Sequence, residues 1–196
     1  MPRSDISDKL IHFTSGVTTE DAFARFQEIV DQRRLIAGNA KIRGRFHCVC
    51  FTEAPLASLR EGLVNRNAYS RYSPFGVLFE KAYIFRNGGR PVIYQSDAEY
   101  DQMPDSLKWR HVRYEPNADP PVDFSWEREW RIRTNALPFE PALAGLVVPD
   151  GDWLQRLAEA HDEQQAWRVH EYAMVLNHTL AELHREPFEW DVFRLP

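Results

Sequence analysis

Residues 126–133 alternate between two kinds of side chain, and this alternation constrains the fold more than any other feature of the sequence. One set is mainly large and apolar: Trp126, Arg128, Trp130 and Ile132. The other set carries only charge: Glu127, Glu129, Arg131 and Arg133. Because successive side chains of a strand point to opposite faces, the segment predicts a β-strand with one face that carries only charge.

Other short runs of β-branched and aromatic residues predict further strands. They cover residues 10–15, 46–52, 76–79, 82–85, 91–94, 143–148 and 190–193, and one more turn or strand is expected around 109–114. Asn87-Gly88-Gly89 has the composition of a hairpin turn. The runs between residues 76 and 94 are therefore expected to form a meander of three short strands.

Helical spacing of apolar residues marks the chain after the first predicted strand. Thr18 and Asp21 have the spacing of a capping box, and Gly38 offers a C-terminal stop. These signals predict an amphipathic helix over residues 19–36. A short helix that opens after a proline is predicted over residues 56–63.

The C-terminal part is also expected to be helical. Helices are predicted over residues 152–160 and 163–185. Trp167, Tyr172 and Leu176 recur at helical spacing in the second of these helices, which predicts that they belong to the core.

The composition favours a single domain. A chain of 196 residues with 43% hydrophobic residues can bury a substantial core, and no Gly/Ser-rich tract divides it. We therefore expect residues 1–196 to form one α+β domain. The 24 Lys and Arg residues against 29 Asp and Glu residues give a net charge of −5, which argues against non-specific nucleic-acid binding.

The sequence predicts a soluble cytoplasmic protein without a membrane partner. No apolar run approaches the roughly 20 residues that span a bilayer, and the charged N-terminal residues do not resemble a signal peptide. Cys48 and Cys50 are the only cysteines, and they cannot form the disulfide framework of a small secreted protein.

His47, Cys48 and Cys50 are residue types that bind zinc, but no second ligand pair follows at a suitable spacing. We therefore expect no metal site and interpret the two cysteines as small buried apolar residues. The sequence also lacks a Walker-type loop, a Rossmann fingerprint and a Gly-x-Ser-x-Gly elbow.

Glu127, Glu129 and Arg131 are the strongest candidates for chemistry, because strand alternation places them on one face. Two carboxylates beside a guanidinium suit the binding of sugar hydroxyls and the stabilisation of a developing positive charge. The alternative is a solvated strand face on which these residues form ion pairs. The pattern alone leaves both interpretations open.

Three segments occur in the order seen in ADP-ribosyltransferase-like folds. Residues 10–15, Leu-Ile-His-Phe-Thr-Ser, are similar to the His-x-Thr strand of the poly(ADP-ribose) polymerase and RNA 2′-phosphotransferase branches, and residues 49–53 follow. Residues 127–131, Glu-Arg-Glu-Trp-Arg, resemble the Glu-x-Glu strand of the mono-ADP-ribosyltransferases. Together with that last strand, three other runs resemble uncharacterised bacterial abortive-infection proteins of the AbiGi type: residues 50–55, 72–76 and 91–94.

This resemblance implies a split antiparallel sheet with flanking helices and a helical C-terminal part, and NAD as the substrate. Glu129 is then the catalytic carboxylate, Glu127 orients the acceptor or a water, and His12 anchors a ribose with Thr14 on the same strand face. A flat cationic leaving group prefers an aromatic platform, and the pyrophosphate needs positive charge. The candidates for these and other contacts with NAD are Tyr69, Tyr72, Phe75, Thr52, Arg43 and Arg45.

The resemblance implies an NAD-dependent ADP-ribosyltransferase that serves as a bacterial toxin or phage-defence effector, with an unknown protein or nucleic acid as acceptor. The alternative is a catalytically inactive binding module of the same fold, such as the antitoxin or phage-sensing half of a defence pair. A third hypothesis is an RNA phosphotransferase or nuclease, against which the acidic net charge argues. For a site that binds NAD, His12 and Glu129 should border one cleft, with an aromatic wall from residues 69–75.

Overall fold

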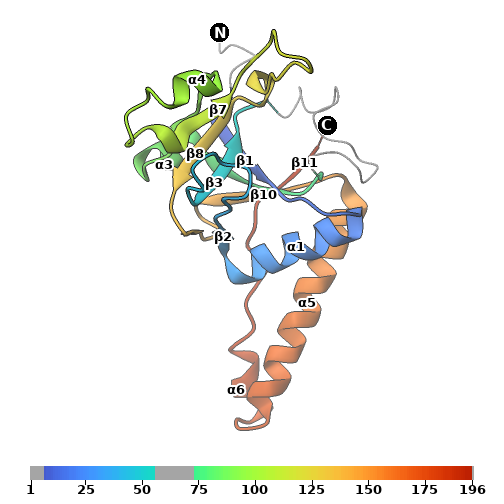
Figure 1. Ribbon diagram of the computed structural model, residues 1–196. Helices are drawn as coiled ribbons and strands as arrows, with labels where there is room; N and C mark the ends of the chain where they lie inside the picture. Colours follow the sequence, from blue (N-terminus) through green and yellow to red (C-terminus); the bar gives the residue numbers. More distant parts are fainter. Residues whose placement is uncertain (1–6, 56–72, 196) are drawn as a thin grey trace.

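Most of the predicted strands lie side by side in one seven-stranded sheet (Figure 1). The computed structural model describes residues 7–55 and 73–195, which form a single α+β domain. The helix predicted over residues 56–63 lies outside the described residues. From one edge of the sheet to the other, the strands are β11 (Val192–Arg194), β10 (Ala144–Val148), β4 (Gly76–Glu80), β1 (Lys9–Phe13), β3 (Cys48–Thr52), β8 (Glu129–Arg133) and β5 (Arg90–Pro91).

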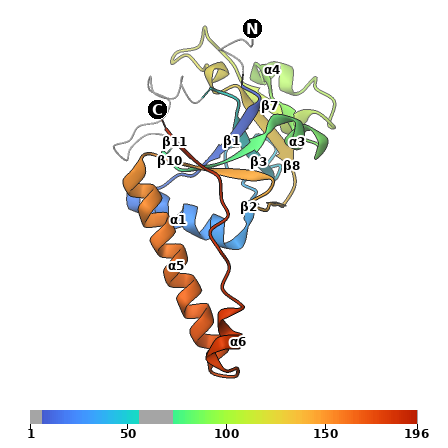
Figure 2. The ribbon, with the colours of Figure 1, turned by 180° about the vertical axis from the view of Figure 1, so that it is seen from behind.

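The sheet is mixed, whereas an antiparallel sheet was expected. All neighbouring strands are antiparallel except β10 and β11, which pair in parallel through Leu146 with Val192. After β10 the chain runs out along a long helix and returns as an extended segment, as both ribbon views show (Figure 2). It therefore enters β11 in the direction of β10.

The main core lies on one face of the sheet. Helix α1 (Thr19–Gln32) contributes Phe23, Phe26 and Val30 to a cluster that includes Leu146 of β10. A smaller cluster packs on other residues of the central strands, and its members are Ile11, Phe13, Ala54, Leu78, Val147 and Leu195. The middle of the sheet is covered on both faces, which explains why all five residues of β10 are buried.

Helix α1 begins at the predicted capping box and ends four residues before the predicted end. The Thr18 side chain accepts a hydrogen bond from the Asp21 amide, and the Asp21 carboxylate accepts one from the Thr18 amide. Arg33 then adopts the left-handed conformation, with φ of 48°, and closes the helix. The following residues form β2 (Arg34–Ile36), which pairs with β9 (Ala136–Pro138), because this segment exchanges backbone hydrogen bonds with another chain segment.

The meander predicted between residues 76 and 94 is wrong. The second of its strands is instead helix α3 (Lys81–Arg86), which buries Ile84 in the core. A run of four apolar residues fits either a strand or one helical turn, so the periodicity alone could not distinguish them. After β5 the chain forms β6 (Ile93–Gln95), which pairs in parallel with β7 (His111–Arg113) in a separate small sheet.

The loop predicted between residues 99 and 123 contains short elements only. Helix α4 (Asp97–Tyr100) precedes it, and the 3-10 turn η1 (Lys108–Arg110) leads into β7, close to the turn or strand expected around 109–114. The small β6–β7 sheet stands beside β8 and forms one wall of a cavity described below.

The strand predicted over residues 126–133 begins at Glu129. Ser125–Glu127 form the 3-10 turn η2, and Arg128 follows in the left-handed conformation with φ of 45°. The alternation of side chains therefore holds from Glu129 onward, whereas Glu127 reaches its position through the turn. A repeat of two residues does not distinguish a strand from a strand preceded by a tight turn.

The register between β1 and β3 is much shorter than that between the other central strands. It comprises one Cα pair, Ile11 with Thr52, whereas β1 pairs with β4 through five residues and β3 pairs with β8 through five. The two strands therefore separate beyond this pair, within the central part of the sheet.

The C-terminal helices form an arm that projects from the body (Figures 1 and 2). Helix α5 (Gly151–Ala173) joins the two helices predicted over 152–160 and 163–185 into one but ends at Ala173. The predicted end at residue 185 is wrong, because the chain turns after α5 and forms the separate short helix α6 (His178–Glu182) at the tip. The prediction that Trp167 and Tyr172 belong to the core is wrong, because their exposed fractions are 70% and 39%. Among the described helices, none is both long enough and apolar enough to cross a bilayer.

Candidate functional site

A cavity of about 690 Å³ lies where β1, β3 and β8 face β7 and the segment before β3. This volume is in the range of pockets that hold small ligands and cofactors. Its lining comes from four separate parts of the chain: residues 11–15, 36–52, 97–113 and 124–131. The cavity borders the place where β1 and β3 separate, so the short register between these strands creates the space that the lining residues enclose.

His12 lies at this opening. Its Nδ1 atom is 2.8 Å from the carbonyl oxygen of Cys50 on β3, and its ring packs edge-on against Phe51. Because a carbonyl only accepts, Nδ1 carries the proton, and Nε2 of the neutral ring is left as an acceptor. Burial lowers the pKa of His12, so the ring is neutral at pH 7. His12 is therefore a fixed hydrogen-bond acceptor in the wall of the cavity.

Glu129 and Arg131 form a two-pronged ion pair on β8. The guanidinium Nε and Nη2 atoms lie 2.8 and 3.2 Å from the two carboxylate oxygens of Glu129. The other guanidinium nitrogen donates to the carbonyl oxygens of Trp109 and His111, at 3.0 and 2.9 Å. The side chains of Glu129 and Arg131 are 13% and 6% exposed. Glu129 and Arg131 are thus ion-paired, as the alternative interpretation expected, but they are buried in the cavity wall and not solvated; Arg133 at the end of the same strand is exposed.

Glu127 is the second carboxylate of the cavity, and it is 3% exposed. The Thr52 hydroxyl donates a hydrogen bond of 2.6 Å to the Glu127 carbonyl oxygen and accepts one from the Ala54 amide. This contact ties the 3-10 turn that carries Glu127 to the end of β3. Thr52 therefore lines the cavity and also fixes the backbone of a candidate catalytic residue.

Two weak acids lie close to the Glu129 carboxylate. Burial, followed by the charge of Glu129, raises the pKa of the Cys50 thiol, so that Cys50 is uncharged at neutral pH. The Tyr94 hydroxyl accepts a hydrogen bond of 3.1 Å from the Glu129 amide, and burial raises the pKa of Tyr94 to about 12. Both groups remain neutral, which leaves the carboxylates and Arg131 as the charges at the floor of the cavity.

The rim of the cavity carries three exposed cations, Lys41, Arg43 and Arg113, and one carboxylate, Asp97. Arg43 donates to Asp97 at 2.6 Å and lies over the Tyr100 ring at 4.1 Å from its centroid. Arg43 also pairs with Asp101, and Arg113 pairs with Glu115, so Lys41 is the one rim cation for which no ion pair is seen among the described residues. The floor holds the carboxyl groups of Glu127 and Glu129 and the guanidinium of Arg131.

The structure brings some of the residues selected from the sequence together and separates others. His12, Arg43, Thr52, Glu127 and Glu129 all line the same cavity. Two others lie outside its lining: the Thr14 hydroxyl donates to the Phe75 carbonyl oxygen, and Arg45 belongs to a turn after the rim. Phe75 is fully buried in the core, and Tyr69 and Tyr72 lie outside the described residues.

Several lining residues were not selected from the sequence: Lys41, Asp97, His111 and Arg113. His111 and Arg113 belong to a strand of three residues within a stretch that has no sustained periodicity. Arg131, in contrast, was selected from the sequence together with Glu127 and Glu129. Its position at i+2 from Glu129 on a strand was the one signal available, since it predicts a shared face.

The described residues contain no group of three His, Cys, Asp or Glu side chains that could hold a metal ion. Cys48 is buried and Cys50 partly buried, both as free thiols. Comparisons with known proteins find no match: no protein family, no curated protein and no solved structure is significantly similar to the chain.

Proposed function

We propose that the protein is an NAD-consuming ADP-ribosyltransferase, and that the cavity beside β1, β3 and β8 is its active site. The observation that carries this proposal is that one cavity has two carboxyl groups, Glu127 and Glu129, at its floor and three cationic side chains at its rim. A ligand that fits has a cationic end and an anionic middle. NAD has this pattern, because its nicotinamide ring is cationic and its pyrophosphate is anionic.

The arrangement of the sheet supports the same proposal. The separation of β1 and β3 beyond the Ile11–Thr52 pair resembles the split sheet expected of ADP-ribosyltransferase-like folds. His12 and Glu129 belong to strands on the two sides of this separation, and both line the cavity. We propose that the Nε2 atom of His12 accepts a hydrogen bond from a ribose hydroxyl, since Nδ1 is already engaged by Cys50.

The chemistry assigned to the floor is cleavage of the bond between nicotinamide and ribose. The electron pair of this bond leaves with the nicotinamide nitrogen, which neutralises the pyridinium, and positive charge develops at the ribose C1′. The Glu129 carboxylate, held by Arg131, stabilises that charge. An acceptor oxygen or nitrogen then forms the new bond to C1′, and the Glu127 carboxylate takes the proton it releases. Lys41, Arg43 and Arg113 are the cations that face the pyrophosphate.

A second candidate function follows from the Glu129–Arg131 pair itself. The guanidinium contacts both carboxylate oxygens, so in this geometry it already neutralises the charge that catalysis requires. A module that binds NAD or a related nucleotide without cleaving it, as a sensor or the inactive partner in a phage-defence or toxin–antitoxin pair, fits this feature.

One set of measurements separates the two functions. Purified protein is incubated with NAD, and nicotinamide release is followed by chromatography, while calorimetry measures binding in parallel. Release that requires Glu129 supports the transferase, and binding without release supports the inactive module. Because a transferase without its acceptor is slow, the assay is repeated with bacterial lysate and labelled NAD to detect transfer to protein or nucleic acid. Absence of both binding and release would exclude both functions.

A further inference from the structure

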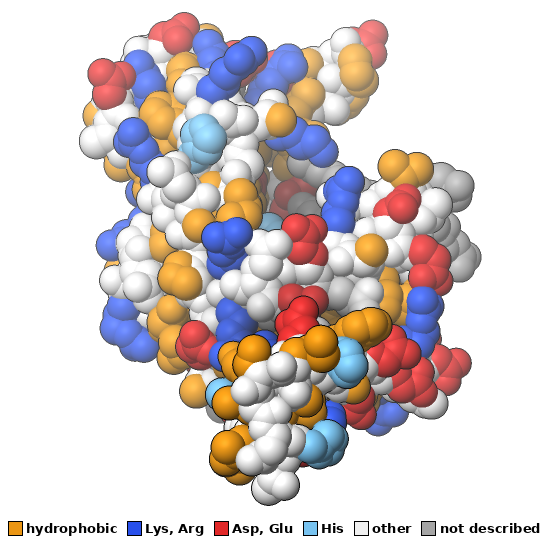
Figure 3. Space-filling view, turned by 90° about the horizontal axis from the view of Figure 1, so that it is seen from below, with side chains coloured by type: hydrophobic (Ala, Val, Ile, Leu, Met, Phe, Trp, Pro, Cys, Tyr) orange, Lys and Arg blue, Asp and Glu red, His pale blue; other side chains and the backbone are white. Residues whose placement is uncertain are grey.

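The tip of the C-terminal arm carries a concentration of exposed apolar side chains that the domain itself does not cover. Six of the twelve large apolar residues exposed among the described residues lie in this segment: Trp167, Tyr172, Met174, Val175, Leu180 and Leu183. Figure 3 looks along the arm from its tip and shows apolar and histidine side chains gathered there. Exposed apolar groups at this density mark an interaction surface.

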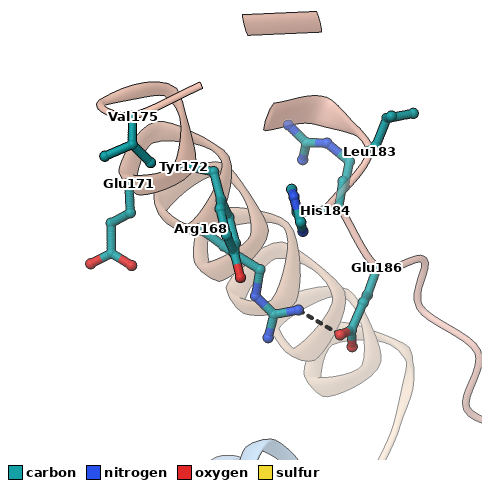
Figure 4. A pocket seen from close by; sticks show the side chains of 8 residues that line it. Arg168, Glu171, Tyr172, Val175, Leu183, His184 and Glu186 are labelled. Carbon is teal, nitrogen blue, oxygen red and sulfur yellow. Dashed lines mark ion pairs between the residues drawn. The ribbon is translucent and has the colours of Figure 1, made fainter. Parts of the chain in front are cut away.

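One side of the arm borders a pocket between α5 and the returning segment, and side chains contact each other across it. Tyr172 stacks on His184 with ring centroids 3.8 Å apart, and Arg168 pairs with Glu186 at 2.6 Å (Figure 4). The Gln165 side chain also accepts a hydrogen bond from the Glu186 amide. This side of α5 therefore has partners in the segment that returns toward the body.

The adjoining face of α5 and its C-cap carries Trp167, His170 and Met174, and Glu171 lies at its edge toward the returning segment. The spacing of three and four residues places these four side chains along one stripe. The Trp167 and His170 rings contact each other edge to face, with centroids 6.0 Å apart. Trp167 and Met174 are 70% and 76% exposed. The stripe has an apolar residue at each end and a base beside an acid at its middle.

Because of this order, the stripe of one copy is complementary to the stripe of a second copy that runs in the opposite direction. We propose that two copies of the chain associate through it in antiparallel orientation, around a two-fold axis that passes between His170 and Glu171. In this arrangement Trp167 packs on Met174 of the second copy, and His170 donates a hydrogen bond to Glu171 of the second copy. Each contact occurs twice, as a two-fold axis requires.

The charge of the arm favours this occupant over a nucleic acid or an anionic membrane. Between residues 161 and 186 the sequence has five Asp and Glu residues and only two Arg residues. Such a segment repels phosphate, whereas the pairing of His170 with Glu171 gives each copy a complementary group on the other. The arm projects away from β1, β3, β7 and β8 (Figure 1), whose residues line the cavity, so the association leaves the candidate active site open.

Sedimentation equilibrium of the full chain tests the proposal. We expect a dimer with twice the 22.9 kDa mass of the chain, and dissociation to the monomer in the Trp167→Glu and Met174→Glu variants. Phe85→Glu is the matched control, because Phe85 is 50% exposed on α3, and this variant should remain dimeric. A monomer at 100 µM wild-type protein, or a dimer that persists in both arm variants, would overturn the proposal.

A charge exchange distinguishes the proposed pairing from loss of folding. His170→Glu places two carboxylates against each other and should weaken the dimer at least tenfold. The double variant His170→Glu/Glu171→His restores one acid opposite one base and should recover most of the affinity. A double variant as weak as the single one would contradict the antiparallel pairing, provided that circular dichroism shows both variants to be folded.

Discussion

Arg131 determines what Glu129 can do at the floor of the cavity. The guanidinium is fixed by the carbonyl oxygens of Trp109 and His111, so it holds the Glu129 carboxylate in one orientation toward the cavity. Removing one partner of a buried pair leaves the other without compensation, which costs about 3–5 kcal/mol. The pair therefore links the stability of the β6–β7 side of the cavity to the geometry of its candidate catalytic group.

The Glu129→Gln variant tests the catalytic role. Gln keeps the volume and one acceptor for Arg131 but removes the negative charge, so turnover of NAD should fall by ~10²-fold or more. Because Arg131 loses its charge partner, the free energy of unfolding should also fall by about 1–3 kcal/mol. Nicotinamide release and urea denaturation are measured on the same preparation, at a temperature where the variant is folded.

Glu53→Gln is the matched control for that experiment. Glu53 is also a partly buried carboxylate with two partners, Lys81 and the Trp130 indole, each at 2.7 Å, but it lies outside the lining of the cavity. This variant should lose stability and keep its turnover. If Glu53→Gln and Glu129→Gln lost the same fraction of turnover, Glu129 would have no specific catalytic role.

His12 makes the stability of the protein depend on pH. Its pKa in the folded state is lowered from 6.5 by burial, so below pH 6.5 the unfolded chain binds a proton that the folded chain does not. The stability that depends on neutral His12 is complete above pH 6.5 and is lost as the pH falls toward the lower pKa of the folded state. Urea denaturation between pH 5 and 7.5 should show this loss.

The His12→Asn variant should reduce that dependence, by up to about 1.4 kcal/mol per pH unit for one proton. Its side-chain amide preserves a donor for the Cys50 carbonyl oxygen but does not titrate. His178→Asn, at a side chain that is 78% exposed, should leave the slope unchanged. An unchanged slope in His12→Asn would show that His12 titrates alike in the folded and unfolded chain.

At the scale of single helices and strands, the sequence predicted the features that depend on residues close together in the chain. Thr18 and Asp21 predicted the start of α1, and runs of β-branched and aromatic residues predicted β1, β3, β4 and β10. The end of α1 was missed, because Arg33 in the left-handed conformation has no signature in the sequence. The residues 82–85 were assigned to a strand because burial of one apolar side chain, here Ile84, satisfies either element.

The sequence also predicted only part of the candidate site, namely residues of its floor. Glu129 and Arg131 share a strand face, which a period of two residues reveals, and both lie in the cavity wall. Of the rim, Arg43 was selected from the sequence, but Lys41 and Arg113 were not. These two residues line one cavity only when the segment before β3 and the strand β7 are placed in three dimensions. Periodicity describes one element at a time, whereas the cavity depends on the register and separation of several strands.

Thr18→Ala tests the capping box of α1. The Thr18 hydroxyl satisfies the Asp21 amide at 3.1 Å, and its removal should destabilise the protein by about 1 kcal/mol. The midpoint of urea denaturation should fall without a change in the slope m. Thr19→Ala is the control, because Thr19 is the first helical residue and lies beyond the cap. Equal effects of the two substitutions would contradict the assignment of Thr18 as the cap.

At the scale of the whole molecule, stability is distributed unevenly along α5. Leu157 near its start belongs to the main core, whereas the distal half buries few side chains, among them Gln165 and Val169. Local opening requires less free energy where less apolar surface is buried. The body and the arm should therefore behave as regions of different stability within one chain.

Hydrogen exchange measures this gradient. In the Trp167→Glu variant, which we expect to be monomeric, amides around Leu157 should exchange at least tenfold more slowly than those around Val169. Helix α1 is the internal reference for a region packed on the core, with Phe26 fully buried. Uniform protection along the whole of α5 would show that the arm is as stable as the body.

The order of the strands in the sheet also bears on synthesis of the chain. The cavity is lined by residues between Ile11 and Arg131, but one edge of β4 is paired with β10, which is translated later. A nascent chain that has reached Arg131 holds all of these lining residues while its central sheet and core are still incomplete. On the proposed function, activity toward NAD would thus require that β10 has been translated and has paired with β4.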